Sequence, residues 1–395
     1  MQRNPYYEQV LFDLLSQMKK DDYAGYEKFD ALNSPFLEAL SLGNPWLRFI
    51  IIQAVKECPL HVRPLLGVKK VRNQKGIALF AKAYLLIYQH TGRKDYLEEA
   101  ERLLNWLLDN PSPGRRNLCW GYSFLWQSVP PFCQDRNEPN IVVTSFAGEA
   151  FVKAWQLTGN PKYKSALESI ARFITEDLPV LIEDEHQRAI AYILTPVDSI
   201  TINVQAMSAG LLAKIYAIIP EERWLEAARK QMQFVQNNIT PEGAWPYALP
   251  LPGSHPIYID YHDNFHTGGL LDNMLDYMEA SRDFRFMPVY EKGLNYYKKN
   301  MFMPDGAPKW TDKKQYPYDI HCCAQGILTF KKASKYHPQL LDDAYKIADW
   351  TLKYMYRPAR HDFIYRKSRF YTWNYSLVRW CNGWMAKALS ELLYT

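Results

Sequence analysis

Apolar positions along the chain follow the 3.6-residue period of helices, in amphipathic segments that recur at a regular interval. Five such segments begin with an aromatic residue or leucine and carry an aromatic residue ten positions later, with charged residues on the remaining face. Their starts lie 54 to 67 residues apart, which indicates a repeat of helical hairpins. The segments cover residues 96–106, 163–173, 224–234, 286–296 and 340–350.

A second helix is predicted before each of these segments, with few charges and many glycine, alanine and serine residues. Because small residues let helices approach closely, we expect these helices to form an inner ring inside the charged outer helices. The predicted inner helices start near Lys75, Ile141, Ile200, Asn264, His321 and Thr372.

The number and order of these helices predict an all-α fold, an (α/α)6 toroid of six helical hairpins. Residues 45–58 are expected to supply the outer helix before the first inner one. Residues 1–33 would then form an extra N-terminal helix and loop packed on the barrel. We expect the whole chain, residues 1–395, to form one domain, because a closed helical barrel uses this length in a single unit.

The connections between the predicted helices alternate in length. Those from an inner to an outer helix are short, whereas those from an outer to an inner helix are long. In an antiparallel ring all the long connections fall on one face, together with the N-termini of the inner helices, and such a face commonly carries function. The long connections cover residues 59–74, 111–140, 178–199, 239–263, 302–320 and 357–371.

The amino-acid composition and the net charge indicate which kinds of ligand the protein can bind. The chain contains 12 Trp, 28 Tyr and 18 Phe, enough to fill helix crossings and also to line a sugar-binding cleft. The net charge of +5 is mild and comes without a basic run, so we expect no nucleic-acid partner. The N-terminal stretch resembles no secretory signal, no apolar run is long enough to span a membrane, and the six Cys are expected to be reduced. A cytoplasmic location is predicted.

The long-loop face gathers the candidate catalytic residues. His266 and His321 lie at the starts of neighbouring inner helices, each shortly after an aspartate that is also a suitable N-cap. Such a cluster can supply a general base, a general acid and a group that polarises a carboxylate. The six predicted catalytic residues are His266, His321, Asp263, Asp319, Asn264 and Tyr261.

Candidate substrate-binding residues lie in the same loops and at the same helix starts. Tryptophan and tyrosine suit stacking against a pyranose ring, and the polar side chains suit its hydroxyl and carboxylate groups. This set comprises Asp30, Trp120, Trp126, Asn140, Asp198, Asn203, Trp245, Tyr247 and Arg379.

A metal or cofactor is not expected. His321, Cys322, Cys323 and Cys381 suggest a zinc site, but adjacent cysteines on a helix point about 100° apart and do not readily face one ion. The chain also lacks a glycine-rich phosphate loop, a Walker motif, a His-Glu-x-x-His motif and a Gly-x-Ser-x-Gly elbow.

Several stretches resemble one family over nearly the whole chain. They are residues 25–34, 63–68, 73–76, 140–149, 242–247, 263–268, 318–321, 324–325 and 379–380. Together they resemble bacterial exopolysaccharide-locus proteins of the VpsJ type. The resemblance implies an α/α toroid encoded with surface-polysaccharide assembly genes, with polysaccharide-assembly proteins as partners. The same architecture occurs in six-hairpin glycosidases, polysaccharide lyases and the helical domains of uronyl C5-epimerases.

Three functions fit these observations. The first is an enzyme on an acidic polysaccharide or oligosaccharide that removes the proton next to a uronate carboxylate, as a lyase or a C5-epimerase. The second is a glycoside hydrolase with two carboxyl groups across the scissile bond. The third is a glycan-binding assembly factor without catalysis. The hydrolase would draw on Asp30, Asp198, Asp263 and Asp319.

Overall fold

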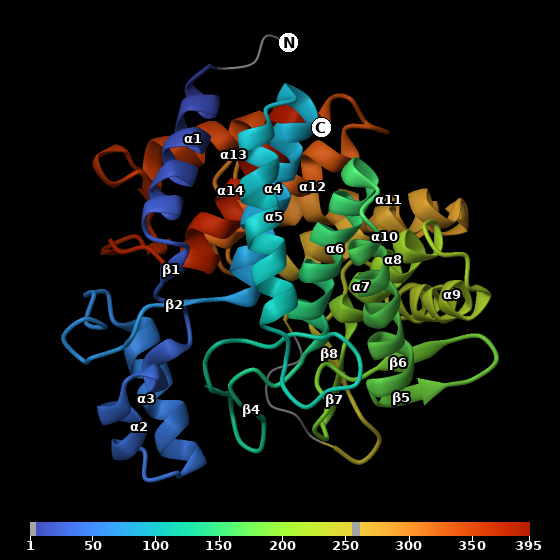
Figure 1. Cartoon of the computed structure of the whole chain (residues 1–395), viewed down its shortest axis with the longest axis horizontal. Helices are drawn as coiled ribbons and strands as arrows, with labels where there is room; N and C mark the ends of the chain where they lie inside the picture. Colours follow the sequence, from blue (N-terminus) through green and yellow to red (C-terminus); the bar gives the residue numbers. More distant parts are fainter. Residues whose placement is uncertain (1–4, 255–260) are drawn as a thin grey trace.

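Six helices form a closed inner ring in the computed structural model, which describes residues 5–254 and 261–395 (Figure 1). Each inner helix packs on the next, and the last packs on the first. The predicted all-α toroid is therefore confirmed. In chain order the inner helices are α4 (Gln74–Thr91), α6 (Ile141–Thr158), α8 (Ile202–Tyr216), α10 (Asn264–Ser281), α12 (Ile320–Ala333) and α14 (Trp384–Tyr394).

Each inner helix pairs with an outer helix. Five outer helices directly follow their inner partners along the chain, whereas the sixth, α1 (Pro5–Lys20), packs on α14 and so joins two distant parts of the sequence. The hydroxyl of Tyr394 in α14 donates a hydrogen bond to Glu8 in α1, with 2.7 Å between the oxygens. The other outer helices are α5 (Lys94–Asp109), α7 (Pro161–Arg172), α9 (Glu222–Asn237), α11 (Met287–Asn300) and α13 (Leu340–Tyr354).

The sixth outer helix is where the structure differs from the sequence-based prediction. The prediction assigned residues 45–58 to that position, but α3 (Pro45–Glu57) packs on the 3-10 turn Asp30–Asn33 and on β3 (Trp126–Gln127). Together with α2 (Pro35–Leu40), α3 covers a second small core beside the long-loop face. The expectation of an extra helix outside the ring holds, but that helix is α3 rather than the N-terminal one.

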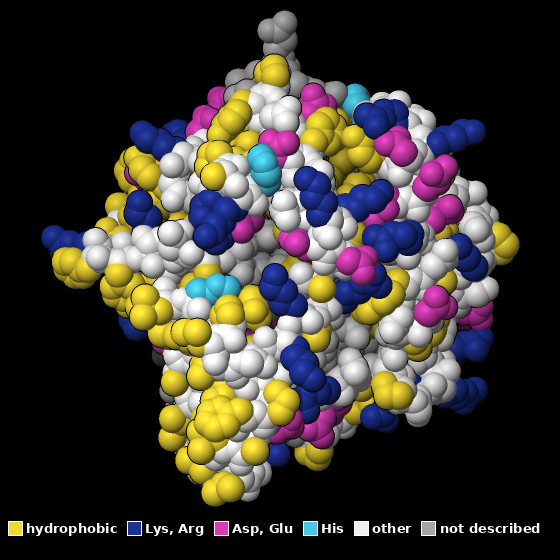
Figure 2. All heavy atoms as spheres, turned by 60° about the vertical axis from the view of Figure 1, so that its left-hand side comes forward, with side chains coloured by type: hydrophobic (Ala, Val, Ile, Leu, Met, Phe, Trp, Pro, Cys, Tyr) yellow, Lys and Arg dark blue, Asp and Glu magenta, His cyan; other side chains and the backbone are white. Residues whose placement is uncertain are grey.

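The outward face of α2 and α3 is apolar. Figure 2 shows hydrophobic side chains gathered at the lower end of this side of the molecule. The exposed large hydrophobic residues of this region include Phe36, Leu40, Leu42, Trp46 and Ile50. No helix within the described residues is long and apolar enough to cross a membrane.

Polar caps fix the starts of the inner helices on the long-loop face. Asn73 caps α4, Asn140 caps α6, Asp263 caps α10 and Asp319 caps α12, each through a side-chain oxygen that accepts from a backbone N–H of the first turn. Small residues then let the helices approach: a Cβ added at Gly268 would lie 2.6 Å from the Tyr297 hydroxyl oxygen. The caps and the small residues together place the helix starts around one opening.

Short antiparallel strands tie the long connections to one another. The pair β7 (Ser199–Thr201) and β8 (Ala248–Pro250) links the connections that precede α8 and α10. A three-stranded sheet, in the order β13 (Thr372–Trp373), β12 (Arg366–Lys367) and β9 (Tyr318–Asp319), links those that precede α12 and α14. Thr372 lies in β13 and does not start an inner helix as predicted; that helix begins at the turn Val378–Gly383 and continues as α14.

The remaining strands form two-stranded pairs. They are β1 (Ala24–Gly25) with β2 (Val71–Arg72), β3 with β4 (Cys133–Gln134), β5 (Val180–Glu183) with β6 (Arg188–Ile190), and β10 (Tyr356–Arg357) with β11 (Asp362–Phe363). Residues 255–260 of the connection 239–263 lie outside the described residues.

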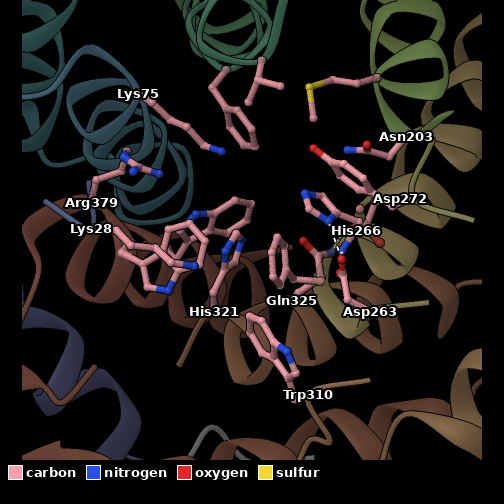
Figure 3. A pocket seen from close by; sticks show the side chains of 18 of the residues that line it. Lys28, Lys75, Asn203, Asp263, His266, Asp272, Trp310, His321, Gln325 and Arg379 are labelled. Atoms are coloured by element: carbon pink, nitrogen blue, oxygen red, sulfur yellow. Dashed lines mark hydrogen bonds and ion pairs between the residues drawn. The ribbon is translucent and has the colours of Figure 1, made fainter. Parts of the chain in front are cut away.

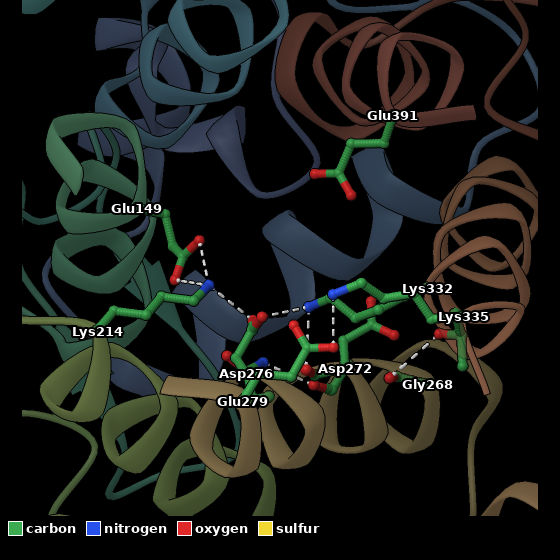
Figure 4. A network of polar contacts seen from close by, with 12 residues as sticks. Glu149, Lys214, Gly268, Asp272, Asp276, Glu279, Lys332, Lys335 and Glu391 are labelled. Atoms are coloured by element: carbon green, nitrogen blue, oxygen red, sulfur yellow. Dashed lines mark hydrogen bonds and ion pairs between the residues drawn. The ribbon is translucent and has the colours of Figure 1, made fainter. Parts of the chain in front are cut away.

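A chain of ion pairs crosses the barrel interior away from the loops, with a charged residue from every inner helix. Figure 4 shows the part of this chain that runs from Glu149 to Lys332. Asp276 of α10 lies 2.9 Å from Lys214 of α8 and 2.6 Å from Lys332 of α12. Opposite charges alternate along the chain, so each buried charge has a partner and the inner helices are held in register. In order the members are Glu391, Lys82, Glu149, Lys214, Asp276 and Lys332.

Candidate functional site

A cavity of about 1110 Å³ runs from the long-loop face into the barrel. Side chains from all six inner helices line it. Four members of the ion-pair chain described above are among them: Lys82, Glu149, Asp276 and Lys332. Trp310, Trp380 and Trp384 are among the aromatic residues of its wall. A cavity of this size and aromatic content suits one or more sugar rings.

The first candidate group is the Asp263–His266 pair at the start of α10. One Asp263 oxygen accepts from the backbone N–H of His266 at 2.8 Å, which caps the helix. The other oxygen lies 2.6 Å from Nδ1 of the His266 ring. A carboxylate at Nδ1 favours the tautomer protonated there, so Nε2 is left free as a base toward the cavity that His266 lines. Capping and orientation of the imidazole are thus two roles of the same aspartate.

The second candidate group is His321 in the first turn of α12. Its side chain is 4% exposed and lies between aromatic rings, 4.4 Å from Phe265 and 4.1 Å from Trp384 between centroids. Burial lowers the pKa of His321 well below its ordinary value, and the charge of Lys75 acts in the same direction. Its Nδ1 is buried without a hydrogen-bond partner among the described residues. A neutral imidazole with an unsatisfied nitrogen therefore lines the same cavity as His266.

The cavity has two electrostatically different sides (Figure 3). Lys28, Lys75 and Arg379 lie on one side, whereas Asp263 and Asp272 lie on the other. Burial raises the pKa of Asp272 to about 6, so this carboxyl group exchanges its proton near neutral pH. An anionic group of a ligand would thus contact the side with the basic residues, whereas a group that must receive a proton would contact the side with Asp272.

Eight of the residues predicted from the sequence line this cavity. They include both histidines, and the face on which they lie was the basis of the prediction. The eight are Asp263, His266, His321, Tyr261, Trp126, Asn203, Tyr247 and Arg379.

Asp319 does not line the cavity, although its neighbour His321 does. Its buried carboxylate lies 2.6 Å from Nε of Arg366 and accepts from Nε1 of Trp380 at 2.8 Å. Both oxygens are thus occupied by the protein itself. The expectation that Asp319 shares the cavity with Asp263, His266 and His321 is corrected.

Six further predicted residues also lie outside the cavity, and most have structural partners. Asp30 pairs with Arg63 at 2.8 Å, and Asn264 bonds to Met301 and Tyr297. The remaining four lie in the core, at a helix cap or in a loop. The indoles of Trp120 and Trp245 donate to backbone carbonyls, Asn140 caps α6, and Asp198 bonds to Ser199.

Sequence reasoning missed the charged residues on the inner helices. Lys75 and Asp272 stand out in retrospect because each is a charge on a helix that is otherwise apolar toward the ring. Such a charge is costly to bury, which is the signal that marks it as paired or functional. Lys28, in contrast, lies in a mixed loop sequence that offers no comparable signal.

No group of three or more histidine, cysteine, aspartate or glutamate residues within 5–254 and 261–395 is arranged to hold a metal ion. The cysteines considered for zinc are buried free thiols, and burial raises the pKa of Cys322 well above its ordinary value.

Comparison with known proteins gives structural similarity alone. No protein-family profile and no curated protein sequence matches the chain. Among solved structures, cellobiose 2-epimerase from Bacillus thermoamylovorans is similar with a TM-score of 0.66 and 11% identity, over 82% of this chain and 89% of that one. A GH76 alpha-mannanase from Bacteroides thetaiotaomicron has a TM-score of 0.62 and 12% identity, over 82% and 86%.

An unsaturated glucuronyl hydrolase specific for heparin is also similar, with a TM-score of 0.60 and 13% identity over 82% of this chain and 87% of that one. These solved neighbours are carbohydrate-processing enzymes. At such low identity the likeness shows that this chain has the fold of six-hairpin (α/α)6 enzymes.

Proposed function

We propose that this protein is a carbohydrate-active enzyme that removes a proton from an acidic polysaccharide or oligosaccharide, by a lyase or C5-epimerase reaction. The observation that carries the proposal is the presence of two imidazoles in one aromatic cavity, one of them oriented by a buried carboxylate. The names of the solved neighbours support a carbohydrate substrate. The resemblance to exopolysaccharide-locus proteins is what suggests surface-polysaccharide metabolism as the context.

In this reaction His266 acts as the general base. Its Nε2 accepts the proton from the carbon next to the sugar carboxylate, and the electron pair moves into the carboxylate group. Asp263 holds the imidazole and stabilises the charge that develops on it. In an epimerase the proton returns from the opposite face; in a lyase the group on the neighbouring carbon leaves.

Tyr261 and His321 are the candidate partners of His266. Burial raises the pKa of Tyr261, so this phenol keeps its proton and serves as a donor to a leaving group rather than as a base. Tyr247 lies between Tyr261 and His266: its ring stacks on that of Tyr261 at 5.2 Å and lies 4.7 Å from that of His266, between centroids. His321 supplies a neutral imidazole to the same cavity.

Hydrolysis is the second candidate, and Asp272 is the observation that favours it. Of the aspartates first considered for hydrolysis, only Asp263 lines the cavity. Asp272 lines it too, and a carboxyl group with a pKa of about 6 suits a general acid. In a hydrolase Asp272 would protonate the glycosidic oxygen, and Asp263 would be the second carboxylate.

Incubation of the protein in D₂O with acidic and neutral oligosaccharides distinguishes these functions. An epimerase that abstracts a proton gives an epimerised product that contains deuterium. A lyase gives an unsaturated product without uptake of water. His266→Gln is expected to abolish either product, whereas His337→Gln, which alters a histidine paired with Glu291 outside the cavity, should leave it unchanged. Products that gain one water indicate hydrolysis instead, and binding without any product indicates a glycan-binding factor.

A further inference from the structure

Lys28 and Lys75 are buried lysines without a carboxylate partner among the described residues, and burial lowers the pKa of both amines well below the ordinary value. Their side chains are each 5% exposed, and no carboxylate among the described residues lies within ion-pair distance of either ammonium. Their nearest partners are aromatic: Nζ of Lys28 lies 3.6 Å from the centroid of Trp380, and Nζ of Lys75 lies 4.1 Å from that of Phe146. Contact with a ring face compensates an ammonium only in part.

The other buried cations nearby are all paired. Arg379 lies 2.9 Å from Glu27, and Arg366 lies 2.6 Å from Asp319. Lys82, seven residues after Lys75 on α4, lies 3.0 Å from Glu149. Since desolvation of an unpaired charge is costly, the two unpaired lysines differ from the structural pattern of the barrel. Both line the cavity, so a molecule in the cavity can reach them.

We infer that Lys28 and Lys75 form an anion-binding site beside His321, which takes the carboxylate, sulfate or phosphate group of a sugar. Trp380 and Trp384 connect the site to the imidazole: Lys28 lies over Trp380, Lys75 lies 4.9 Å from the centroid of Trp384, and both rings contact His321. An anion bound between the two amines favours their protonated forms, so the lysines take up a proton as it binds and supply the charge for it. Arg379 does not supply this charge, because Glu27 already occupies that guanidinium. This site rests on the proposed function only in that the ligand is a sugar.

The site also links the charge of the bound sugar to the protonation of His321. The free cavity keeps this imidazole neutral first through burial, and positive charge on the surrounding basic side chains, Arg379 among them, acts in the same direction. A bound anion offsets those charges and raises the affinity of the imidazole for a proton. An acidic sugar would thus prepare His321 as a proton donor, whereas a neutral sugar of the same shape would not.

Binding of small sugars to the intact protein tests the site. D-glucuronate and glucose 6-phosphate are the anionic probes, which distinguish a carboxylate from a phosphate as the preferred group, and D-glucose is the neutral one. Ligand-observed NMR is expected to give at least about ten-fold weaker anion binding for Lys28→Met and Lys75→Met, with glucose binding unchanged. Lys70→Met is the matched control, because this exposed lysine also lies over an aromatic ring, that of Tyr26, but outside the cavity.

Thermal unfolding of the same variants excludes loss of fold as the cause. Methionine keeps the length and the apolar contacts of the lysine and removes a buried amine that has no carboxylate partner, so the melting temperature should stay constant or rise. Anion binding that is as strong in both variants as in the wild type, or weakened equally by Lys70→Met, would overturn the site. Loss of anion binding in the two variants, in a protein that exchanges no sugar proton, would support the site and refute the proposed reaction.

Discussion

Replacement of His266 separates a functional histidine from a structural one. The side chain is 28% exposed, and its described polar contact is the 2.6 Å bond to Asp263. Its ring also lies 4.7 Å from that of Tyr247 and 4.2 Å from that of Phe265 between centroids. A hydrogen bond to a charged group contributes roughly 1.5–3 kcal/mol when fully buried. Because water from the cavity can replace the imidazole, we expect His266→Ala to cost about 1–2 kcal/mol of the free energy of unfolding.

The expected loss of activity is larger than this loss of stability. Removal of a general base slows a reaction by roughly 10²–10⁴-fold, which corresponds to about 3–5 kcal/mol on the activation barrier. His266→Gln should show nearly the same loss of rate with less destabilisation, since glutamine fills more of the space. Asp263→Asn keeps an oxygen for the helix cap but removes the carboxylate, and it should reduce the rate less than either change at His266.

The assay pairs thermal unfolding with the deuterium-exchange measurement on the same preparations. A functional His266 gives variants that melt within a few degrees of the wild type and that have lost turnover. The reasoning is refuted if both variants melt far below the wild type while their folded fraction turns over substrate at the normal rate. In that case the 2.6 Å contact with Asp263 holds the start of α10 and does not orient a base.

Three further measurements test the energetics of the barrel. Asp276→Asn weakens the pairs with both Lys214 and Lys332, so it should lower the free energy of unfolding in urea by roughly 3–5 kcal/mol. Glu279→Gln, in an exposed pair, should lower it by under about 1 kcal/mol, and equal effects of the two changes would contradict the structural role of the ion pairs. The pKa of Asp272 is raised to about 6 from the ordinary 3.8, so between these pH values the folded chain keeps a proton that the unfolded chain releases. The free energy of unfolding should therefore fall by up to roughly 3 kcal/mol as pH rises from about 4 to 6, and Asp272→Asn should remove this pH dependence. Calorimetry should give a single unfolding transition if residues 1–395 form one domain, and two separate transitions would show two.

The ring of hairpins was predictable because it follows from local periodicity. Charged and apolar helices alternate in the sequence, and short and long connections alternate with them, so the face that carries the helix starts could be named in advance. The sixth hairpin was not predictable in this way, because its two helices, α14 and α1, lie at opposite ends of the sequence. Residues 45–58 have the right pattern and the nearer position, yet they cover the loops.

The prediction of the candidate site was right about the face that carries it but wrong about Asp319, for a related reason. Asp263 and Asp319 have the same local context, an N-cap before a histidine, and the sequence cannot separate them. A residue 47 positions further along, Arg366, occupies the carboxylate of Asp319, whereas Asp263 is left to bind His266. Partners contributed by distant loops decide which of two similar aspartates faces the cavity.

Pairing of α1 with α14 has a consequence for the synthesis of the chain. The hydrogen bond from Tyr394 to Glu8 spans 386 residues, so the last hairpin cannot form until the far end of the barrel has been made. Until then the buried face of α4 has no α14 to pack on. At about 5–20 residues per second, the roughly 300 residues between them take about 15–60 s to emerge from the ribosome. During that time an unfinished barrel exposes an apolar edge, and self-association of nascent chains competes with closure of the ring.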